Sequence, residues 1–142
     1  MSDVVHIALG IHDPQGDYSR HAGAMLASLF MHAAVPVIAH LVHNDSLTAA
    51  NKQKLQQVAQ RFGKEIRFYP VQLPATVRPL AGHVTEGALF RLLLPELVSV
   101  DKIIYFDCDI VVTLDIALLW NVDLAGKPVA AVLDPGVSAF PE

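Results

Sequence analysis

The segment Lys102-Ile-Ile-Tyr-Phe-Asp-Cys-Asp-Ile-Val-Val112 carries two carboxylates inside an otherwise apolar run. A short apolar run of this kind predicts a buried strand. Side chains at positions i and i+2 of a strand share one face, so Asp107 and Asp109 should point the same way. Two buried carboxylates this close repel each other unless a cation neutralises them. The pair therefore predicts a divalent metal site, and its hard oxygen ligands favour Mg²⁺ or Mn²⁺.

The composition indicates one α/β domain with a sizeable core. The chain has 142 residues, of which 53% are hydrophobic and only 17% charged, and the apolar residues fall into short runs typical of strands covered on both faces. No run reaches the ~20 apolar residues of a membrane span, and the N-terminus lacks the layout of a signal peptide. A net charge of -4 predicts no attraction to nucleic acid, and the single cysteine, Cys108, favours a reducing, cytoplasmic compartment.

Apolar periodicity and turn residues predict strands that alternate with helices along the chain. We expect strands at 4–9, 37–42, 65–71, 102–106 and 129–133, helices at 19–33, 47–62 and 86–97, and a short helix or turn at 114–120. This alternation predicts a mainly parallel sheet flanked by helices, and ligands of such sheets bind beyond the carboxyl ends of the strands. The loop after the first strand and the acidic pair after the fourth should therefore lie at the same edge.

Four sequence blocks in this order resemble glycosyltransferase family 8, which includes bacterial lipopolysaccharide glucosyl- and galactosyltransferases and the glycogenins. The blocks are Phe90–Leu97 (FRLLLPEL), Asp101–Val112 (DKIIYFDCDIVV), Leu119–Leu124 (LWNVDL) and Ala130–Asp134 (AAVLD), and the segments His6–Ile11 and Ser28–Leu29 resemble the family's first strand and helix. The resemblance covers essentially the whole chain. Four ordered blocks are far more specific than an Asp-x-Asp pattern alone.

The resemblance implies a GT-A fold and a retaining, metal-dependent transfer of a hexose from a UDP-sugar to a saccharide acceptor, either lipopolysaccharide or another glycan. In the family's motif Asp109 is a metal ligand, and Asp107 touches both the metal and the ribose. The resemblance favours Mn²⁺, with Mg²⁺ as the alternative. A divalent cation between these carboxylates and the donor diphosphate would stabilise the negative charge that develops on the leaving group.

The resemblance also implies donor contacts outside the acidic pair. Arg91 matches the arginine that contacts the donor, and Asp134 matches a polar contact to the donor sugar. Tyr18 falls where an aromatic ring stacks on uracil, a use that suits a flat, amphipathic ring. The backbone of Cys108, rather than its thiol, is expected to face the nucleotide.

The chain departs from the family pattern in the loop Ile11–Tyr18, which is longer than the usual Asp-x-Asn-Tyr and lacks the Asn. Either Asp13 or Asp17 could contact the uracil or ribose, and the sequence does not choose between them. Residues 88–90 (ALF) stand where the family often has Thr-Tyr before the arginine, which removes hydroxyl groups near the donor.

The family continues with an acceptor-binding half and a late histidine that completes the metal shell, and both are absent from residues 1–142. We therefore expect this chain to be the nucleotide-sugar-binding part of a GT-A domain, inactive by itself. Apolar surface that the other half would cover predicts self-association through that face. The parent protein could work at the inner face of a membrane, as lipopolysaccharide transferases do.

Two other functions stay open from the sequence. The run Asp107–Val111 (DCDIV) fits the first motif of haloacid dehalogenase-type phosphotransferases, in which the first Asp is a nucleophile and the second a general acid. Those enzymes need a later lysine and a later acidic pair, and Lys127 is the single lysine after Asp109. A fragment that binds nucleotide without turnover is the other alternative. The acidic pair itself could also be a solvated turn after a strand, with no binding function.

Overall fold

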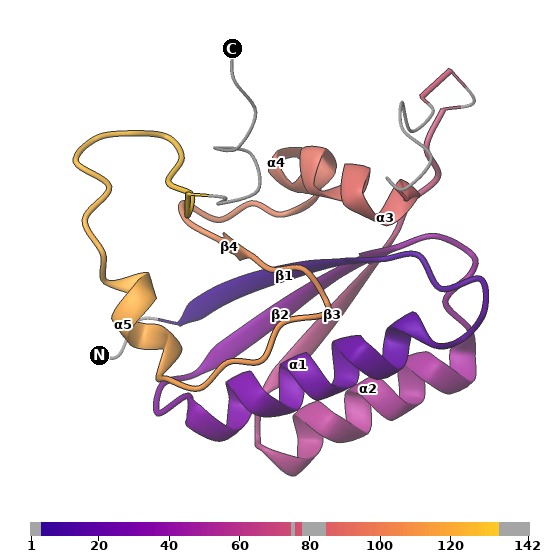
Figure 1. Cartoon of the computed structure of the whole chain (residues 1–142), viewed down its shortest axis with the longest axis horizontal. Coiled ribbons are helices and arrows are strands. Elements are labelled where there is room, and N and C mark those ends of the chain that lie inside the picture. Colours follow the sequence, from indigo (N-terminus) through magenta and orange to yellow (C-terminus); the bar gives the residue numbers. More distant parts are fainter. Residues whose placement is uncertain (1–3, 75, 78–84, 134–142) are drawn as a thin grey trace.

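A computed structural model describes residues 4–74, 76–77 and 85–133 and shows a parallel four-stranded sheet (Figure 1). The strands β1 (Val5–Ile11), β2 (Val37–His43), β3 (Glu65–Pro70) and β4 (Ile104–Tyr105) lie in the order β3-β2-β1-β4. The central pairing runs from Val5↔Val37 to Ile11↔His43, whereas β4 pairs with β1 at two positions only, Ile7↔Ile104 and Ala8↔Tyr105. The predicted α/β class with a mainly parallel sheet is confirmed.

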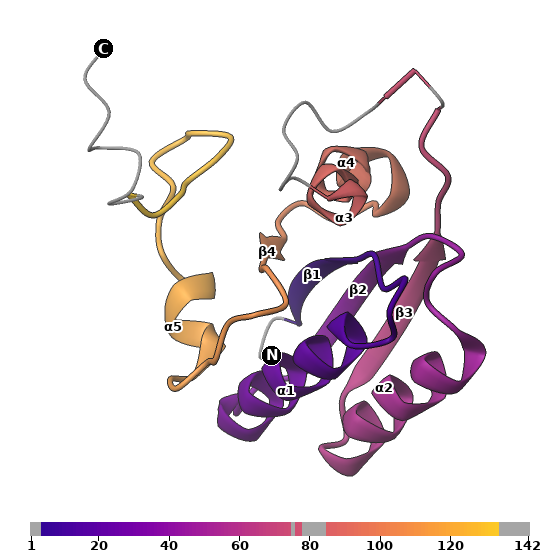
Figure 2. The same cartoon turned by 45° about the vertical axis from the view of Figure 1, so that its right-hand side comes forward.

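Helices cover both faces of this sheet (Figure 2). The long helices α1 (Tyr18–His32) and α2 (Ala49–Arg61) lie on one face. A chain of short elements lies on the other: α3 (Glu86–Leu89), the 3-10 helix η1 (Phe90–Leu93) and α4 (Leu94–Leu97). Helix α5 (Ile116–Trp120) follows β4, and Lys102 Nζ, just before β4, donates to the Trp120 carbonyl at 2.7 Å. No helix in the described ranges is long and apolar enough to cross a membrane.

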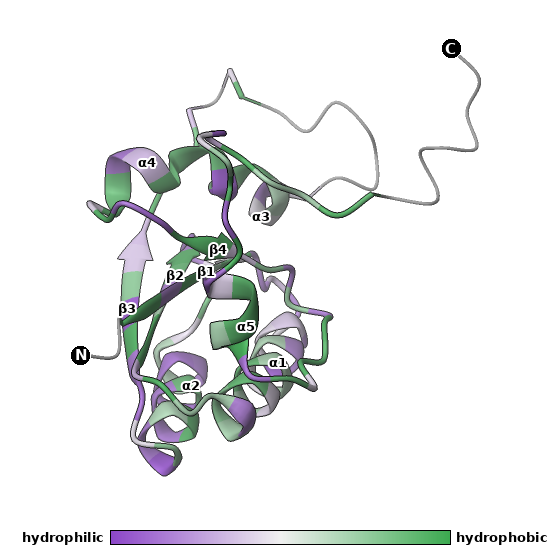
Figure 3. Cartoon of the chain, turned by 90° about the vertical axis from the view of Figure 1, so that its left-hand side faces the viewer, coloured by the Kyte–Doolittle hydropathy of each residue, from purple (hydrophilic) through white to green (hydrophobic). Residues whose placement is uncertain are grey.

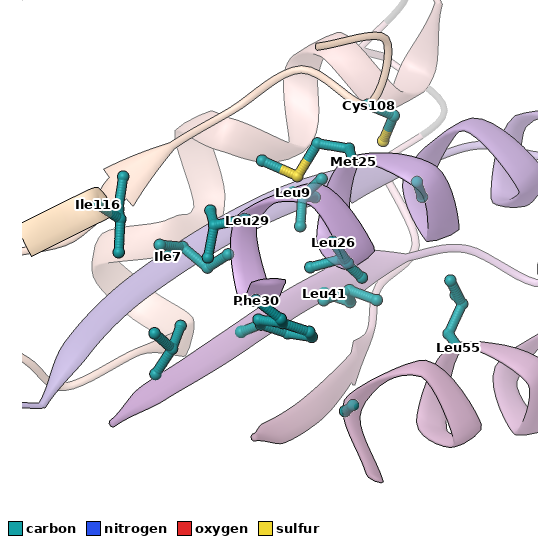
Figure 4. Packing of buried hydrophobic residues seen from close by; sticks show 14 of the residues in the cluster. Ile7, Leu9, Met25, Leu26, Leu29, Phe30, Leu41, Leu55, Cys108 and Ile116 are labelled. Carbon is teal, nitrogen blue, oxygen red and sulfur yellow. The ribbon is translucent and has the colours of Figure 1, made fainter. Parts of the chain in front are cut away.

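The main core lies between the sheet and the α1–α2 layer (Figure 4). Alternate residues of β1 and β2 point to this face, and α1 meets them with apolar positions spaced three and four apart. The labelled core residues are Ile7, Leu9, Met25, Leu26, Leu29, Phe30, Leu41, Leu55, Cys108 and Ile116. Because Cys108 belongs to this cluster, the turn that carries the acidic pair is anchored in the core.

Helix α2 begins later than its sequence suggests. We expected the helix to begin at residue 47, but Thr48 is the N-cap: it has an extended backbone, and its side chain accepts a hydrogen bond from Asn51 N. Such a cap contributes about 1 kcal/mol. The side chains of Asn44 and Ser46 are therefore free for the contacts at the edge of the sheet described below.

A second, smaller core lies under α3, η1 and α4, and a close approach between two glycines closes it. A Cβ on Gly10 of β1 would overlap the carbonyl oxygen of Gly87 and would lie 3.3 Å from Phe90 Cβ. Phe90 is fully buried in this core beside Ala8. Only glycine at position 10 lets α3 approach the sheet this closely, which sets the position of Arg91 on η1.

Two predicted elements are wrong in extent or kind. The single helix expected at 86–97 is three short pieces, because Pro95 has no N–H to donate to the Arg91 carbonyl and its ring crowds that carbonyl. The chain tightens there into 3-10 geometry, and Leu94 N donates to Arg91 O instead.

The expected strand at 129–133 is absent from the structure. Residues 129–133 are exposed, with Val132 at 93% and Leu133 at 94%, and they pair with no strand of the described chain. A strand needs a partner for its backbone, and the outermost strand, β4, offers only a two-residue ladder. The expected strand at 102–106 shrinks to Ile104–Tyr105, because the chain stays in register with β1 only at Ile7 and Ala8.

Candidate functional site

The acidic pair lies in the turn that follows β4, at the carboxyl edge of the sheet. Asp107 and Asp109 are exposed on either side of Cys108, which is 1% exposed. We expected buried carboxylates on a strand, and this is wrong, because the strand ends at Tyr105 and the Asp107 side chain is 53% exposed. The buried Cys108 between them nevertheless holds both acids on the solvent side of the turn. Solvent therefore screens the repulsion between the two carboxylates.

Arg91 is brought to the acidic pair from the opposite layer. Its Nη2 donates to Asp107 Oδ1 at 3.0 Å, its Nε donates to the Ala88 carbonyl at 2.8 Å, and its guanidinium lies 4.5 Å from the centre of the Tyr105 ring. The helical carbonyl and the aromatic ring fix the side chain, since both favour a planar cation. The site therefore presents one fixed positive charge directly beside the carboxylates.

Tyr18 lies near the same turn, from the first residue of α1. Burial raises the pKa of its phenol to about 12, and the nearby carboxylates Asp109 and Asp107 act in the same direction. Its ring is half-buried against the main core and meets the edge of His21. Tyr18 is thus a neutral hydroxyl and a flat ring next to the acidic pair.

The thiol of Cys108 points away from the edge, into the core. It donates to the Gly10 carbonyl at 3.5 Å, and burial raises its pKa to about 12, with the charge of Asp107 adding to the effect. The thiol is therefore out of reach of a ligand at the edge of the sheet, and only the backbone of Cys108 could contact one. Among the donor-site residues expected from the sequence, Asp134 lies outside the described residues.

Asp13 and Asp17, which the sequence left as alternatives, have different surroundings. Asp13 is 2% exposed, and its carboxylate accepts from Tyr18 N at 2.7 Å and from Asn51 Nδ2 at 3.3 Å. Asp17 is exposed and makes a surface pair with Arg20 at 3.3 Å, without capping α1 through its side chain. Asp13 therefore fixes the start of α1, and Asp17 belongs to the solvated surface of the loop.

A polar network at the ends of β1 and β2 was missed by the sequence reasoning. Asn44 Nδ2 donates to Glu86 Oε2 at 2.9 Å and lies 2.8 Å from His12 Nδ1, while Ser46 bonds both Asn44 Oδ1 and the backbone of Asp13. It joins the first two strand ends to the start of α3. The signal was present: a polar residue directly follows each of the first two strands, at the edge where ligands bind.

The residues present fit a divalent cation only in part. Asp107 and Asp109 supply hard, exposed carboxylate oxygens, the ligand type that Mg²⁺ and Mn²⁺ take. Within the described part of the chain, no three His, Cys, Asp or Glu side chains gather closely enough to hold a metal ion. Two protein carboxylates with the remaining positions left to water and substrate phosphate is a usual arrangement for such ions.

Comparison with known proteins identifies relatives across nearly the whole chain. Residues 6–142 match the model of Glycosyl transferase family 8. General stress protein A of Bacillus subtilis (strain 168) is 32% identical over 139 residues, which cover 94% of this chain and 48% of that protein. Probable galacturonosyltransferase-like 4 of Arabidopsis thaliana is 30% identical over 138 residues, which cover 92% of this chain and 38% of that protein. The chain spans less than half the length of these relatives.

Solved structures share the fold. Galactosyltransferase LgtC, solved in complex with donor and acceptor sugar analogues, superposes with a TM-score of 0.69 at 23% identity, over 86% of this chain and 43% of that one. The bifunctional glycosyltransferase WbbM superposes with a TM-score of 0.68 at 23% identity, over 87% of this chain and 22% of that one. The GT-A fold expected from the sequence is confirmed by these likenesses.

Proposed function

This chain belongs to glycosyl transferase family 8, and we propose that it carries the donor- and metal-binding part of a retaining hexosyltransferase that uses a UDP-sugar. The single observation that supports this most is the exposed Asp107–Asp109 pair beside the fixed Arg91 cation. Carboxylates for a metal and a guanidinium for phosphate oxygens are the groups that a sugar diphosphate requires. The proposed acceptor is a glycan, lipopolysaccharide among the candidates.

In this proposal each residue of the site has one task. Asp107 and Asp109 hold Mn²⁺, or Mg²⁺, which when bound neutralises charge on the leaving diphosphate. Arg91 binds a donor oxygen and is kept in place by Tyr105 and by the Ala88 carbonyl. The Tyr18 ring stacks on the base.

The remaining donor contacts come from the loops at the same edge. Asp13 holds the start of α1, and with it Tyr18, in position for the base. The backbone of Cys108 faces the nucleotide, and Asp134 contacts the donor sugar. Asp17 remains the weaker candidate for the nucleoside, since it is occupied at the surface by Arg20.

We propose that residues 1–142 form the nucleotide-sugar-binding part of a larger catalytic domain. The match to a glycosyltransferase family removes support from the phosphotransferase alternative. Nucleotide binding without turnover remains the second candidate for this chain by itself, because the described residues offer two carboxylates and no third metal ligand of the His, Cys, Asp or Glu type. We also propose that the protein is cytoplasmic, and that the longer protein containing this chain binds peripherally at the inner face of a membrane.

Self-association is also part of the proposal. Most residues of helix α5 are hydrophobic (Figure 3), and two of them are exposed, Leu118 at 65% and Leu119 at 50%. The exposed apolar residues Val129, Val132 and Leu133 follow this helix in the chain. Burying such surface against a second copy would remove it from water. Sedimentation velocity of the chain should show a dimer fraction that grows with concentration, and Leu118→Lys should reduce it. A monomer at all concentrations would contradict this part.

The test of the donor site is a calorimetric titration of UDP with and without Mn²⁺. Wild-type chain should bind UDP only with the metal, and Asp109→Asn should lose that binding because one of two protein ligands is gone. Asp101→Asn, at an exposed position before β4, is the matched control and should bind as wild type. Equal UDP affinity with and without Mn²⁺, in wild type and Asp109→Asn alike, would overturn the metal-bridge assignment.

A further inference from the structure

The hydrogen-bond network around Asn44 has a direction that can be assigned atom by atom. Ser46 N is a donor only, and it donates to Asn44 Oδ1, as does the Ser46 hydroxyl. The other side-chain atom of Asn44 is therefore the nitrogen, and it donates to Glu86 Oε2. Since the same nitrogen contacts His12 Nδ1 at 2.8 Å, that ring nitrogen must be the acceptor.

This assignment fixes the tautomer of His12. A neutral imidazole whose Nδ1 accepts a hydrogen bond carries its proton on Nε2, on the far side of the ring from Asn44. The half-buried side chain thus presents an N–H donor that cannot readily become an acceptor. Glycine at position 87 lets α3 approach His12 closely, because a Cβ there would lie 3.3 Å from both His12 Cβ and His12 N.

His12 lies at the carboxyl edge of the sheet, in the same cluster of contacts as the proposed donor site. Gly87 touches both His12 and Gly10, the Tyr105 hydroxyl lies beside Gly10, and Arg91 covers the Tyr105 ring. Along this edge the strand ends follow in the order β4, β1, β2. A diphosphate held after β4 therefore places its nucleoside toward the ends of β1 and β2, where Tyr18 and His12 lie.

We propose that His12 is the residue that reads the nucleotide base, with Nε2–H donating to the 4-carbonyl oxygen of uracil. This inference rests on the proposed function, because it takes the ligand to be a nucleoside diphosphate. Cytosine carries an amino group at the same position, so two donors would face each other and one polar group would be left without a partner. A site built to bond a carbonyl rejects an analogue that lacks it.

The first experiment compares UDP with CDP, which share the ribose and the diphosphate, in titrations with Mn²⁺. Wild type should prefer UDP by at least about tenfold, roughly the effect of one well-made hydrogen bond. His12→Phe should weaken UDP binding by about tenfold and bring the two affinities within about twofold of each other. His32→Phe, at an exposed position at the end of α1, is the matched control and should keep the preference.

A double substitution reverses the donor and acceptor roles in the hydrogen-bond network without removing His12. In Asn44→Asp combined with Glu86→Gln, the new glutamine donates to the new carboxylate, which can only accept from His12 Nδ1–H. Nε2 then becomes an acceptor in the neutral ring, and at pH 8 the preference should shift from UDP toward CDP. Nitrogen-15 NMR of the His12 ring reads the tautomer directly, with Nε2 protonated in wild type and unprotonated in the double variant.

The outcomes separate this inference from the function on which it rests. Wild type that binds neither nucleotide with Mn²⁺ would overturn the proposed function. Wild type that binds UDP and CDP equally, or keeps its preference in His12→Phe, would overturn base reading while leaving the donor site intact. Nε2 found unprotonated in wild type by NMR would overturn the tautomer assignment, whether or not any nucleotide binds.

Discussion

The guanidinium of Arg91 lies 3.0 Å from Asp107 Oδ1, so the fixed cation of the site already occupies an oxygen that a metal would need. Both side chains are about half exposed, and pairs of this kind contribute roughly 0–1 kcal/mol to stability. The pair is therefore weak enough to be exchanged when a ligand arrives. We infer that Arg91 exchanges only its Nη2 contact, from the carboxylate to the donor diphosphate, while the Ala88 carbonyl and the Tyr105 ring keep the guanidinium in place and Asp107 is left to the cation.

This relationship predicts opposite effects of one substitution on two ligands. Arg91→Met should bind Mn²⁺ alone a few-fold more tightly, because a competing charge is removed, and should bind UDP with Mn²⁺ more weakly, because a phosphate contact is lost. Electron paramagnetic resonance of free Mn²⁺ measures the first effect and calorimetry the second. Arg20→Met removes a comparable surface pair with Asp17 and should change neither. Equal weakening of both ligands by Arg91→Met would rule out the exchange.

The sequence predicts the parallel sheet well because its two central strands, β1 and β2, lie between turn residues and are buried on both faces. The sequence-based prediction fails where contacts with distant parts of the chain, or one proline, determine the secondary structure. Residues 129–133 have the composition of a strand but lack a partner in this structure, and the 86–97 helix is broken by the backbone chemistry of Pro95. Local strand propensity cannot show whether the neighbouring strand is long enough to pair with a further strand.

The acidic pair could be located from its spacing, but its partners could not. Arg91 is 16 residues from Asp107, and His12 is 32 residues from Asn44, so neither contact leaves a local pattern. Asp13 and Asp17 look alike in the sequence, and only the fold buries the first and exposes the second. The sequence predicts a cation because both carboxylates are expected to be buried. Since Asp107 is exposed, water can solvate the pair without a cation, and a metal role depends on the ligand that binds there.

The Gly10–Gly87 approach predicts a large difference between two glycine-to-alanine substitutions. Gly10→Ala must push α3 away from the sheet, and overpacking of this kind costs typically about 1–3 kcal/mol. Gly23→Ala is the control, because its Cβ would lie at an ordinary 3.7 Å from Leu55 Cδ2 and alanine favours the helix by about 1 kcal/mol. Urea unfolding should therefore show opposite shifts of the midpoint. Equal stability of the two variants would contradict the close packing of α3.

Cys108 should be chemically silent in the folded chain. Burial raises the pKa of its thiol to about 12, so almost none is thiolate at pH 8, and the side chain is 1% exposed. A disulfide reagent should therefore label it only as fast as the chain opens, and rapidly in strong denaturant. Fast labelling of native protein at pH 8 would show that the turn carrying the acidic pair leaves the core more readily than its packing implies.

Acid should destabilise the fold through the histidine pair on the opposite side of the sheet from α1. His40 is 1% exposed and lies between His6 Nδ1 and the Tyr69 hydroxyl, each at 2.9 Å. Burial lowers its pKa to about 4, His6 and Arg67 act in the same direction, and Glu65 opposes them. The unfolded chain, with a pKa near 6.5, therefore binds more protons between pH 6.5 and 4.

The sign of the pH dependence follows from that difference. The contribution of neutral His40 is fully present above pH 6.5 and is lost as the pH falls toward 4, on the order of 2 kcal/mol at pH 5. Urea unfolding at pH 7 and pH 5 should show this loss in wild type, and His40→Gln should reduce the difference between the two pH values. His32→Gln, at an exposed position on α1, should keep the wild-type difference. Equal pH dependence in wild type and His40→Gln would contradict this prediction. It would mean that protonation of the buried His40, between His6 and Tyr69, does not cause the loss of stability in acid.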